Sequence, residues 1–257
     1  NYELIISVGD NTGVSSSKNF NIEVGSAKDV LDNLITKEQE SLSDIRGEIL
    51  NYDLFSSNAI ENILNLDEIE KKLSNISSNY LLIKETGTEQ EFKLLLSDLL
   101  EIGLPKSINK ISDSSSLTFF PKTENIDLGI IETIAGGSYD ADLEEEYKDA
   151  ISAWYLNNVR TKVSVKEYSA NYDLEEEMLV KTFKLEINDL GTEEDSYIFV
   201  NEMEGINFKE NMTYDDSSKY YYKEFSDESI EFYTTEDINI EDLPIFISPS
   251  LEKLEVD

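Results

Sequence analysis

The sequence predicts an α+β fold, in which a β-hairpin, a helical section and a mixed domain follow one another along 257 residues. Three successive spacing patterns of the apolar residues indicate this order. Apolar residues alternate with polar ones over residues 2–24, recur at helical spacing over residues 26–102, and return mainly to alternation from Thr161 on. We therefore expect three regions, at 1–25, 26–103 and 104–257.

The first region predicts two strands joined by the turn-rich stretch "GDNTGVSSS". Two strands alone are only marginally stable in water. The hairpin is therefore expected to complete a larger sandwich or to pack on the rest of the chain. The apolar positions of the two alternating runs are Leu4, Ile6, Val8, Phe20, Ile22 and Val24.

An aromatic-led strand that ends in an Asp–Gly-type turn runs from Tyr2 through Asp10, Asn11 and Gly13. This pattern resembles the last two strands of PKD-like and cadherin-like domains of the immunoglobulin type. The resemblance covers residues 1–25 only. Because such domains occur in tandem outside cells, it implies an extracellular chain whose hairpin ends an immunoglobulin-like sandwich.

The second region predicts two or three antiparallel helices, with a coiled-coil stalk as the alternative. Ser26 is a candidate N-cap with Asp29 three residues later, and Thr88 is a candidate N-cap for a later helix. A middle helix is expected to start at Asn65 or Asp67, and Gly103 and Pro105 are expected to end the section. The apolar residues at helical spacing are Val30, Leu31, Leu34, Ile35, Leu42, Ile45, Ile49, Ile69, Leu73, Ile76, Tyr80, Ile83, Phe92, Leu95, Leu96 and Leu99.

The third region predicts a mainly antiparallel sheet with a few helices. The stretch "INKISDSSSLTFFP" predicts a hairpin or edge strand, and "NIDLGIIETIAGG" predicts a short helix ended by Gly136 and Gly137. An amphipathic helix is expected from Tyr139 to Tyr155. Further strands are expected at 161–168, 178–188, 197–200, 230–234 and 243–247.

Two stretches of this region resemble a family of uncharacterised archaeal cell-surface proteins, in which such a segment follows immunoglobulin-like repeats. They are "EEYKDAISAWYLNNV" and "TTEDINIEDLPIFISP". The family has no assigned activity, so the resemblance implies a location at the cell surface. The residues that carry it are Tyr147, Trp154, Asn158, Asp242, Pro244 and Pro249.

The charge is strongly one-sided, because 55 acidic and 21 basic residues give a net charge of −34. Such a field repels phosphate backbones and anionic lipid, so we expect no nucleic-acid binding. No stretch reaches the roughly 20 apolar residues that span a bilayer, so we expect no membrane insertion. Adaptation to high salt is one interpretation; the scarcity of Arg and the abundance of Ile and Asn favour an AT-rich genome instead.

The chain contains no Cys and no His. This excludes disulfides, thiolate catalysis, tetrahedral zinc sites with Cys or His ligands, and a Ser–His–Asp triad. Paired carboxylates remain as a catalytic option, as in glycoside hydrolysis. With so many acids a pair means little by itself, so we expect no enzyme and name no catalytic residue.

Acidic clusters offer candidate calcium sites, because calcium binds six to eight oxygen ligands. None matches the EF-hand spacing. The favoured interpretation of residues 140–146 is a helix N-terminus whose carboxylates complement the helix dipole, and that of Asp215 and Asp216 is an ordinary loop. The expected cofactor is none, or calcium at Asp140, Asp142 and Glu144. The clusters are Asp10 with Asn11, Asp140 with Asp142, Glu144 and Glu145, and Asp215 with Asp216.

Two further patterns are candidate sites. The sequons that start at Asn75 and Asn211 are candidate glycosylation sites, and Asn211 is the better one because a loop is expected there. The aromatic stretch "KYYYKEF" is a candidate sugar- or protein-binding patch, formed by Tyr220, Tyr221 and Tyr222 with Trp154. An aromatic strand with one buried face is the favoured alternative.

The leading functional hypothesis is a non-enzymatic extracellular module, structural or adhesive. In its sharper form the N-terminal hairpin adds strands to neighbouring surface-protein domains or to copies of itself, in a surface layer or filament. The second hypothesis is a ligand-binding ectodomain of a receptor or transport protein, with a pocket at Tyr147, Trp154 or residues 220–222. The third is a carboxylate-based hydrolase with two acids about 5–10 Å apart in a cleft.

Overall fold

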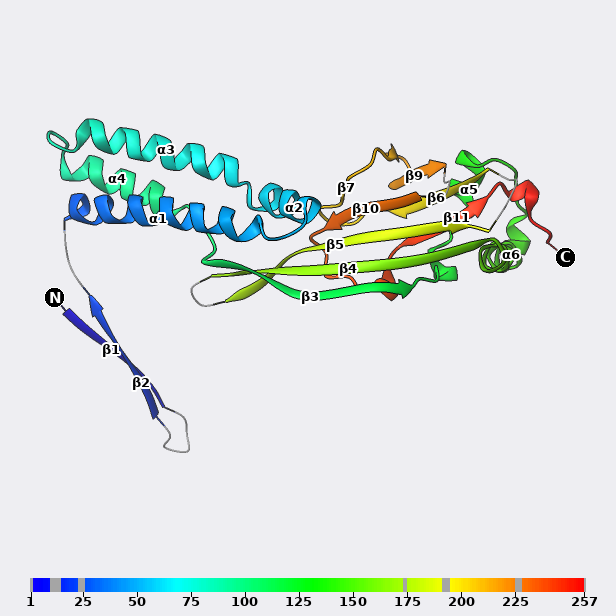
Figure 1. The fold of residues 1–257 in the computed structure, drawn as a ribbon, viewed down its shortest axis with the longest axis horizontal. Helices are drawn as coiled ribbons and strands as arrows, with labels where there is room; N and C mark the ends of the chain where they lie inside the picture. The colour runs from blue at the N-terminus through cyan, green and yellow to red at the C-terminus, as the bar shows by residue number, and fades with distance from the viewer. Residues whose placement is uncertain are drawn as a thin grey trace. The chain divides into compact units, whose positions relative to one another are not determined.

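The computed structural model describes residues 2–9, 15–22, 26–172, 175–190, 195–224 and 228–256 (Figure 1). Its helices and antiparallel sheets confirm the α+β class. The chain divides into two compact units, Asn1–Gly47 with Leu64–Leu104 and Glu48–Ile63 with Pro105–Asp257. The predicted division was three consecutive regions. In the structure, Glu48–Ile63, which the prediction placed in the helical section, belongs to the unit that contains the two larger sheets.

The N-terminal hairpin consists of β1 (Tyr2–Gly9) and β2 (Ser15–Ile22). The strands are antiparallel and paired along their whole length, with Tyr2 opposite Ile22 and Gly9 opposite Ser15. They form a sheet of two strands only. The expected turn residues Asp10, Asn11 and Gly13, and the apolar Val24, lie outside the described residues.

Three helices make up the described helical part of the first unit: α1 (Ala27–Ile49), α3 (Leu66–Ile83) and α4 (Glu89–Leu100). Ion pairs join opposite ends of α1 and α3, from Lys84 to Asp32 and from Arg46 to Asp67, so these helices are antiparallel. The backbone N–H of Ala27 donates to Glu89 Oε1 (3.4 Å), so α1 and α4 start at the same end. The expected antiparallel helices are present.

The N-cap residue predicted from the sequence is confirmed at two of the three helix starts. Thr88 Oγ1 accepts from the backbone N–H of Glu91 while the Glu91 carboxylate accepts from Thr88, a complete capping box. Ser26 and Asp29 make the same reciprocal pair. Asn65 is different: it adopts a left-handed backbone (φ 54°) and its side chain caps no backbone N–H. Its amide donates to Glu68 Oε2 instead (2.8 Å).

Helix α2 (Leu54–Leu64) was not expected from the sequence. Its buried residues are Ser56, Ser57, Ala59 and Ile60, so its inner face carries little of the apolar signal that marks a helix. The helix covers one face of a sheet, where the Phe55 and Tyr233 ring centroids lie 5.9 Å apart. The Ser56 and Thr182 hydroxyls are 3.4 Å apart at the same place.

The second unit contains two antiparallel sheets (Figure 1). The five-stranded sheet has the order β3-β4-β5-β10-β7 and the four-stranded sheet the order β11-β6-β9-β8. These sheets confirm the predicted antiparallel pairing. The strands are β3 (Ser107–Thr118), β4 (Val159–Asn171), β5 (Glu176–Asp189), β6 (Ser196–Asn201), β7 (Asn207–Phe208), β8 (Thr213–Asp215), β9 (Tyr220–Glu224), β10 (Glu228–Thr234) and β11 (Ile245–Pro249).

Two apolar cores stabilise this unit, one on each face of the four-stranded sheet. Between the sheets, Phe183, Leu185 and Ile187 of β5 pack with residues such as Ile198 and Ile245. The alternation predicted for β5 is therefore confirmed. On the other face, α5 (Leu128–Ile134) and α6 (Glu144–Asn158) cover the sheet. The buried residues of this second core are Ile126, Leu128, Ile130, Ile131, Ile151, Phe199, Tyr220, Phe246 and Leu251.

Short 3₁₀ turns and two glycines complete the helical layer. Gly136 (φ 87°) and Gly137 (φ 93°) follow α5, as predicted, in a backbone conformation that side chains with a Cβ rarely adopt. A Cβ on Gly137 would also lie 2.8 Å from the backbone nitrogen of Glu252. The 3₁₀ turns are η1 (Thr123–Asn125), η2 (Ala141–Leu143), η3 (Ile240–Asp242) and η4 (Leu251–Lys253).

Strand β3 lies at the edge of its sheet, as predicted, and part of that edge is covered. The N–H of Ile108 donates to Glu48 Oε2 (2.8 Å) and its carbonyl accepts from the Tyr52 hydroxyl (2.9 Å). Register shifts interrupt the β3–β4 pairing twice further along. Covered groups and bulges are devices that keep an edge strand from pairing with other chains. Open strand pairing is therefore restricted here.

Asp53 holds the start of α2 against the sheet. Its carboxylate accepts from the backbone N–H of Ser56 (3.0 Å) and from Lys166 Nζ of β4 (2.9 Å). Partial burial by itself would raise the pKa of Asp53. The hydrogen bonds from Lys166 and Ser56 outweigh it and lower that pKa from 3.8 to about 2.

We predict that Asp53→Asn destabilises the protein by about 1 kcal/mol at neutral pH, a figure reduced for the partial exposure of the pair. Because the pKa of Asp53 is lower in the folded chain, its stabilisation is present above about pH 4 and is lost as the pH falls toward 2. Urea unfolding at several pH values would show the gap between wild type and variant closing over that interval. Asp149→Asn, at an exposed position on α6, is the control. An equal loss in both variants, or a gap that does not change with pH, would contradict the assignment.

Candidate functional site

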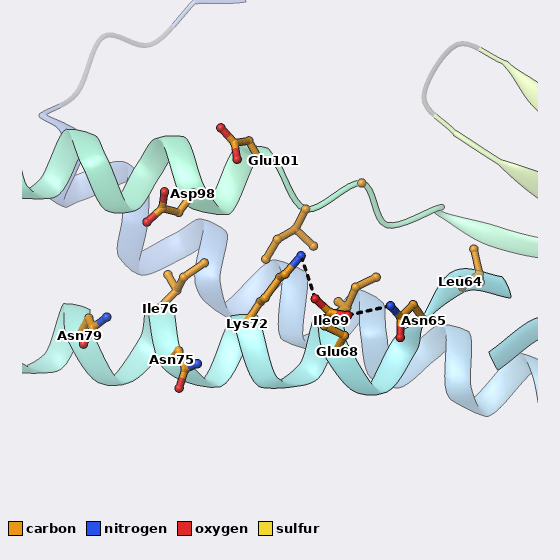
Figure 2. A pocket seen from close by; sticks show the side chains of 12 residues that line it. Leu64, Asn65, Glu68, Ile69, Lys72, Asn75, Ile76, Asn79, Asp98 and Glu101 are labelled. Atoms are coloured by element: carbon orange, nitrogen blue, oxygen red, sulfur yellow. Dashed lines mark hydrogen bonds and ion pairs between the residues drawn. The ribbon is translucent and has the colours of Figure 1, made fainter. Parts of the chain in front are cut away.

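The first unit has a groove of about 570 Å³ between α3 and the end of α4 (Figure 2). Its apolar floor includes Ile76, which is buried. Its walls are polar: Lys72 and Glu68 form an ion pair on α3 (3.5 Å), and Asp98 and Glu101 line the groove on the α4 side. The groove is open to solvent and its charges are paired or exposed, so it offers a polar surface for contact.

A second concave site, which we call the acidic pocket, lies at one end of the four-stranded sheet and measures about 390 Å³. Three carboxylates line it, from Glu124 of η1, Asp127 before α5 and Glu144 at the start of α6. The ends of β6 and β9 contribute Asn201 and Tyr220. Its other lining residues are Asn125, Ile126, Leu128, Gly129, Tyr139 and Pro244.

A third pocket is apolar and smaller, about 260 Å³. It lies beside α6, where Phe120 and Leu156 are 59% and 50% exposed at its rim. Its hydroxyl groups are used within the protein: Ser152 Oγ donates to the Lys148 carbonyl (3.0 Å), and the Tyr155 hydroxyl lies 2.6 Å from Thr161 Oγ1. This pocket therefore offers apolar contact.

The candidate calcium residues do not converge. Asp140 Oδ1 accepts from the backbone N–H of Asp142 (3.0 Å) as the cap of η2, and Glu144 pairs with Lys148 (2.6 Å). Asp215 accepts hydrogen bonds from Ser217 and Ser218. Within the described ranges, no group of three or more Asp or Glu side chains has the arrangement of a metal site. Asp10 and Asn11 lie outside those ranges.

The expected aromatic patch is divided between the two cores. Tyr220 is buried against Phe246, and Tyr222 packs on the same core beneath the helices. Tyr221 and Trp154 pack instead on the core between the sheets. The four rings therefore do not share one exposed surface, and β9 is an aromatic strand with side chains on both faces.

The two sequons lie at exposed positions of different kinds. Asn211 is exposed in the connection between β7 and β8, where an acceptor asparagine is accessible. Asn75 is exposed on α3 and lines the groove of Figure 2. Glycosylation of either residue stays a prediction.

The resolved pKa shifts of the described carboxyl groups favour the charged form and not a proton donor. A general acid of that kind requires a raised pKa. Among the described carboxyl groups, every resolved shift lowers the pKa, through hydrogen bonds or ion pairs that favour the charged form. These groups are Asp53, Glu91, Asp113, Glu176, Glu186, Asp215 and Asp242.

Comparison of the sequence and structure with protein-family models, with curated proteins and with solved structures found no match. In the part of the chain that the structure describes, no helix is both long enough and apolar enough to cross a membrane.

Two buried tyrosines differ in how their hydroxyl groups are used. The Tyr155 hydroxyl lies 3.0 Å from the Phe119 carbonyl oxygen and 2.6 Å from Thr161 Oγ1. No hydrogen bond joins the Tyr220 hydroxyl to any described residue. Burial raises the pKa of each tyrosine to about 12, so both hydroxyls keep their proton at neutral pH.

We predict that Tyr155→Phe costs about 1–2 kcal/mol, because it leaves buried polar atoms without partners. Tyr220→Phe is expected to change the free energy of unfolding by less than about 0.5 kcal/mol, because no bond within the described chain is lost. Each variant is the matched control of the other in a urea titration. Equal losses would show that the Tyr220 hydroxyl has a structural partner.

Proposed function

We propose that this chain is a non-enzymatic module on the outside of a cell that works by binding and assembly. The N-terminal hairpin carries the proposal. Strands β1 and β2 pair only with each other among the described residues, so each has one edge open for a further strand. A pair of strands gains stability when more strands join it.

The charge of the chain sets a condition on this assembly. The net charge of −34 makes copies repel one another. Ion pairs already occupy many basic side chains, among them Lys122, Lys148 and Lys166, so the surplus of carboxylates is left at the surface. Strand pairing between copies would therefore have to overcome repulsion that salt screens.

The lowered carboxyl pKa values support a non-enzymatic role, because they favour charged, paired carboxylates over proton donors. The carboxylate-based hydrolase gains no support from them. Ligand binding is the second candidate function, favoured by one specific observation. The acidic pocket is concave and is lined by Tyr220, one of the aromatic residues expected to form such a site.

We predict that the chain self-associates through the hairpin, more strongly at about 1 M than at about 0.15 M NaCl, because salt shortens the range of repulsion. Sedimentation velocity over a concentration series measures this. Deletion of residues 1–25, or Ile5→Pro within β1, should abolish the association, since proline cannot donate to a strand ladder. Ile5→Val, which keeps the strand donor, is the control. Identical sedimentation of the full and shortened chains at every salt concentration would exclude assembly through the hairpin.

The proposed location has its own test. Protease added to intact cells that produce the native gene product should digest this chain, while a cytosolic marker stays intact until lysis. Digestion only after lysis would place the chain inside the cell and refute the surface proposal.

A further inference from the structure

The Tyr220 hydroxyl is an unused polar group at the wall of the acidic pocket. The residue is 6% exposed, and no described residue hydrogen-bonds to its oxygen. Among the described residues, Arg46 Nε is the fully buried side-chain nitrogen or oxygen without a partner. Tyr220 lines the acidic pocket, and its hydroxyl oxygen is not one of these fully buried, unpartnered atoms.

The pKa of Tyr220 reflects its surroundings at the wall of the acidic pocket. Burial is the larger cause of the raised pKa of Tyr220, and the negative charge of Asp127 raises it further. Asp127 and Tyr220 line the same pocket, so the carboxylate and the phenol are both available to one ligand. Because this hydroxyl makes no hydrogen bond to the described residues, it is available to bond a ligand.

Each carboxylate of the pocket has one oxygen engaged and one open. Asp127 Oδ1 accepts from the backbone N–H groups of Gly129 and Ile130. Glu144 Oε1 pairs with Lys148 (2.6 Å), and Glu124 Oε1 lies 3.6 Å from Lys122. In the described ranges these bonds and ion pairs engage Asp127 Oδ1, Glu144 Oε1 and Glu124 Oε1.

The charge around the pocket remains negative after these pairs are counted. Lys148 has a second acidic partner, Glu145 (3.5 Å), and Lys122 has a second, Asp242 (2.7 Å). Two lysines therefore face five carboxylates once Asp127 is included. The N–H groups at the start of α5 are already bonded to Asp127, so they do not offer a site for an anion.

The open groups of the pocket are mainly acceptors. Asn125 lines the pocket and donates its amide N–H to the Leu243 carbonyl (3.0 Å), which leaves its amide oxygen as one more acceptor. The described residues hold no group of three or more Asp or Glu side chains arranged to hold a metal ion. A primary ammonium group has three N–H donors and one positive charge, and it binds acceptors that are spread around a wider space.

We propose that the acidic pocket binds a primary ammonium group, with the Tyr220 hydroxyl and the open carboxylate oxygens of Asp127 and Glu144 as its acceptors. The ring of Tyr139 on the pocket wall adds a face to which a cation is attracted. The volume of about 390 Å³ has room for the alkyl chain that carries the ammonium. This chain belongs either to a free diamine or to a lysine side chain of a partner. The inference deepens the ligand-binding candidate and does not depend on the hairpin.

Isothermal titration calorimetry of the full chain in about 0.15 M NaCl tests the proposal, because that salt screens loose attraction to the acidic surface. The probes are 1,4-diaminobutane and N-acetyl-lysine methylamide, which stand for the two sources of the ammonium. The comparison ligands are 1,4-butanediol, calcium chloride and methyl glucoside. We expect saturable binding of one or both amines with a stoichiometry of one, and no binding of the uncharged diol.

Variants connect the binding to the pocket. Tyr220→Phe and Asp127→Asn should each weaken amine binding by roughly tenfold or more, since each removes a bond to a charged group. Asparagine keeps the helix cap, so Asp127→Asn is expected to fold. Glu132→Gln, at an exposed position of α5 outside the pocket, removes the same unit of charge and should leave the affinity within about twofold.

Several outcomes would overturn the proposal. These are the absence of amine binding, equal weakening by Glu132→Gln and Asp127→Asn, and an affinity unchanged by Tyr220→Phe. Saturable binding of calcium or of the glucoside that displaces the amine would reassign the pocket to that ligand. Sedimentation of the same variants separates the two proposals, because loss of amine binding should leave hairpin-mediated association unchanged.

Discussion

The second unit depends on one constraint: its four-stranded sheet is apolar on both faces. In β11 every residue is buried, with Ile245 and Ile247 in the core between the sheets and Phe246 in the core beneath the helices. A sheet of this kind must be covered twice, because each exposed face would leave large apolar side chains in water. The five-stranded sheet covers one face, and α5 and α6 cover the other. The acidic pocket lies where the ends of β6 and β9 meet the starts of these helices.

The basic side chains and the carboxylates occupy different places in the molecule. The few basic side chains are placed where a carboxylate must be held, as Lys166 holds Asp53 against the sheet and Lys181 holds Asp237. The Lys181 side chain is only 7% exposed and continues the inner row of β5. A buried cation of this kind is stable only with partners, so it fixes the segment that carries Asp237. The remaining carboxylates stay at the surface, where they give the chain its negative field.

The two proposals use different parts of the molecule and different physics. Hairpin assembly would rest on backbone hydrogen bonds, which are independent of side-chain identity and work against the net charge. The acidic pocket would use that charge, because its acceptors are carboxylates and an unbonded phenol. A surface module can combine both, since strand pairing sets its neighbours and a cation site adds a contact with selectivity.

The sequence alone determined much of the local structure, because caps, periodicity and stop residues act over a few neighbours. The Thr88 N-cap, the glycines after α5 and the alternation of β5 were all predicted. Absence of Cys and His also excluded whole classes of site before any fold was considered. Helix α2 was missed because its buried face places the polar Ser56 and Ser57 beside Ala59 and Ile60, which weakens the apolar pattern.

The candidate site, in contrast, was decided by tertiary structure. The aromatic residues of β9 form one run in the sequence. Adjacent strand residues point to opposite faces, however, so Tyr220 and Tyr221 belong to different cores. No sequence pattern distinguishes Asp127 and Glu124 from the other acidic residues of a chain with 55 of them. They come together with Tyr220, almost a hundred positions later, only because two apolar faces force the helices and the sheet to meet. No local pattern records that meeting, since contacts between distant segments depend on how the layers pack.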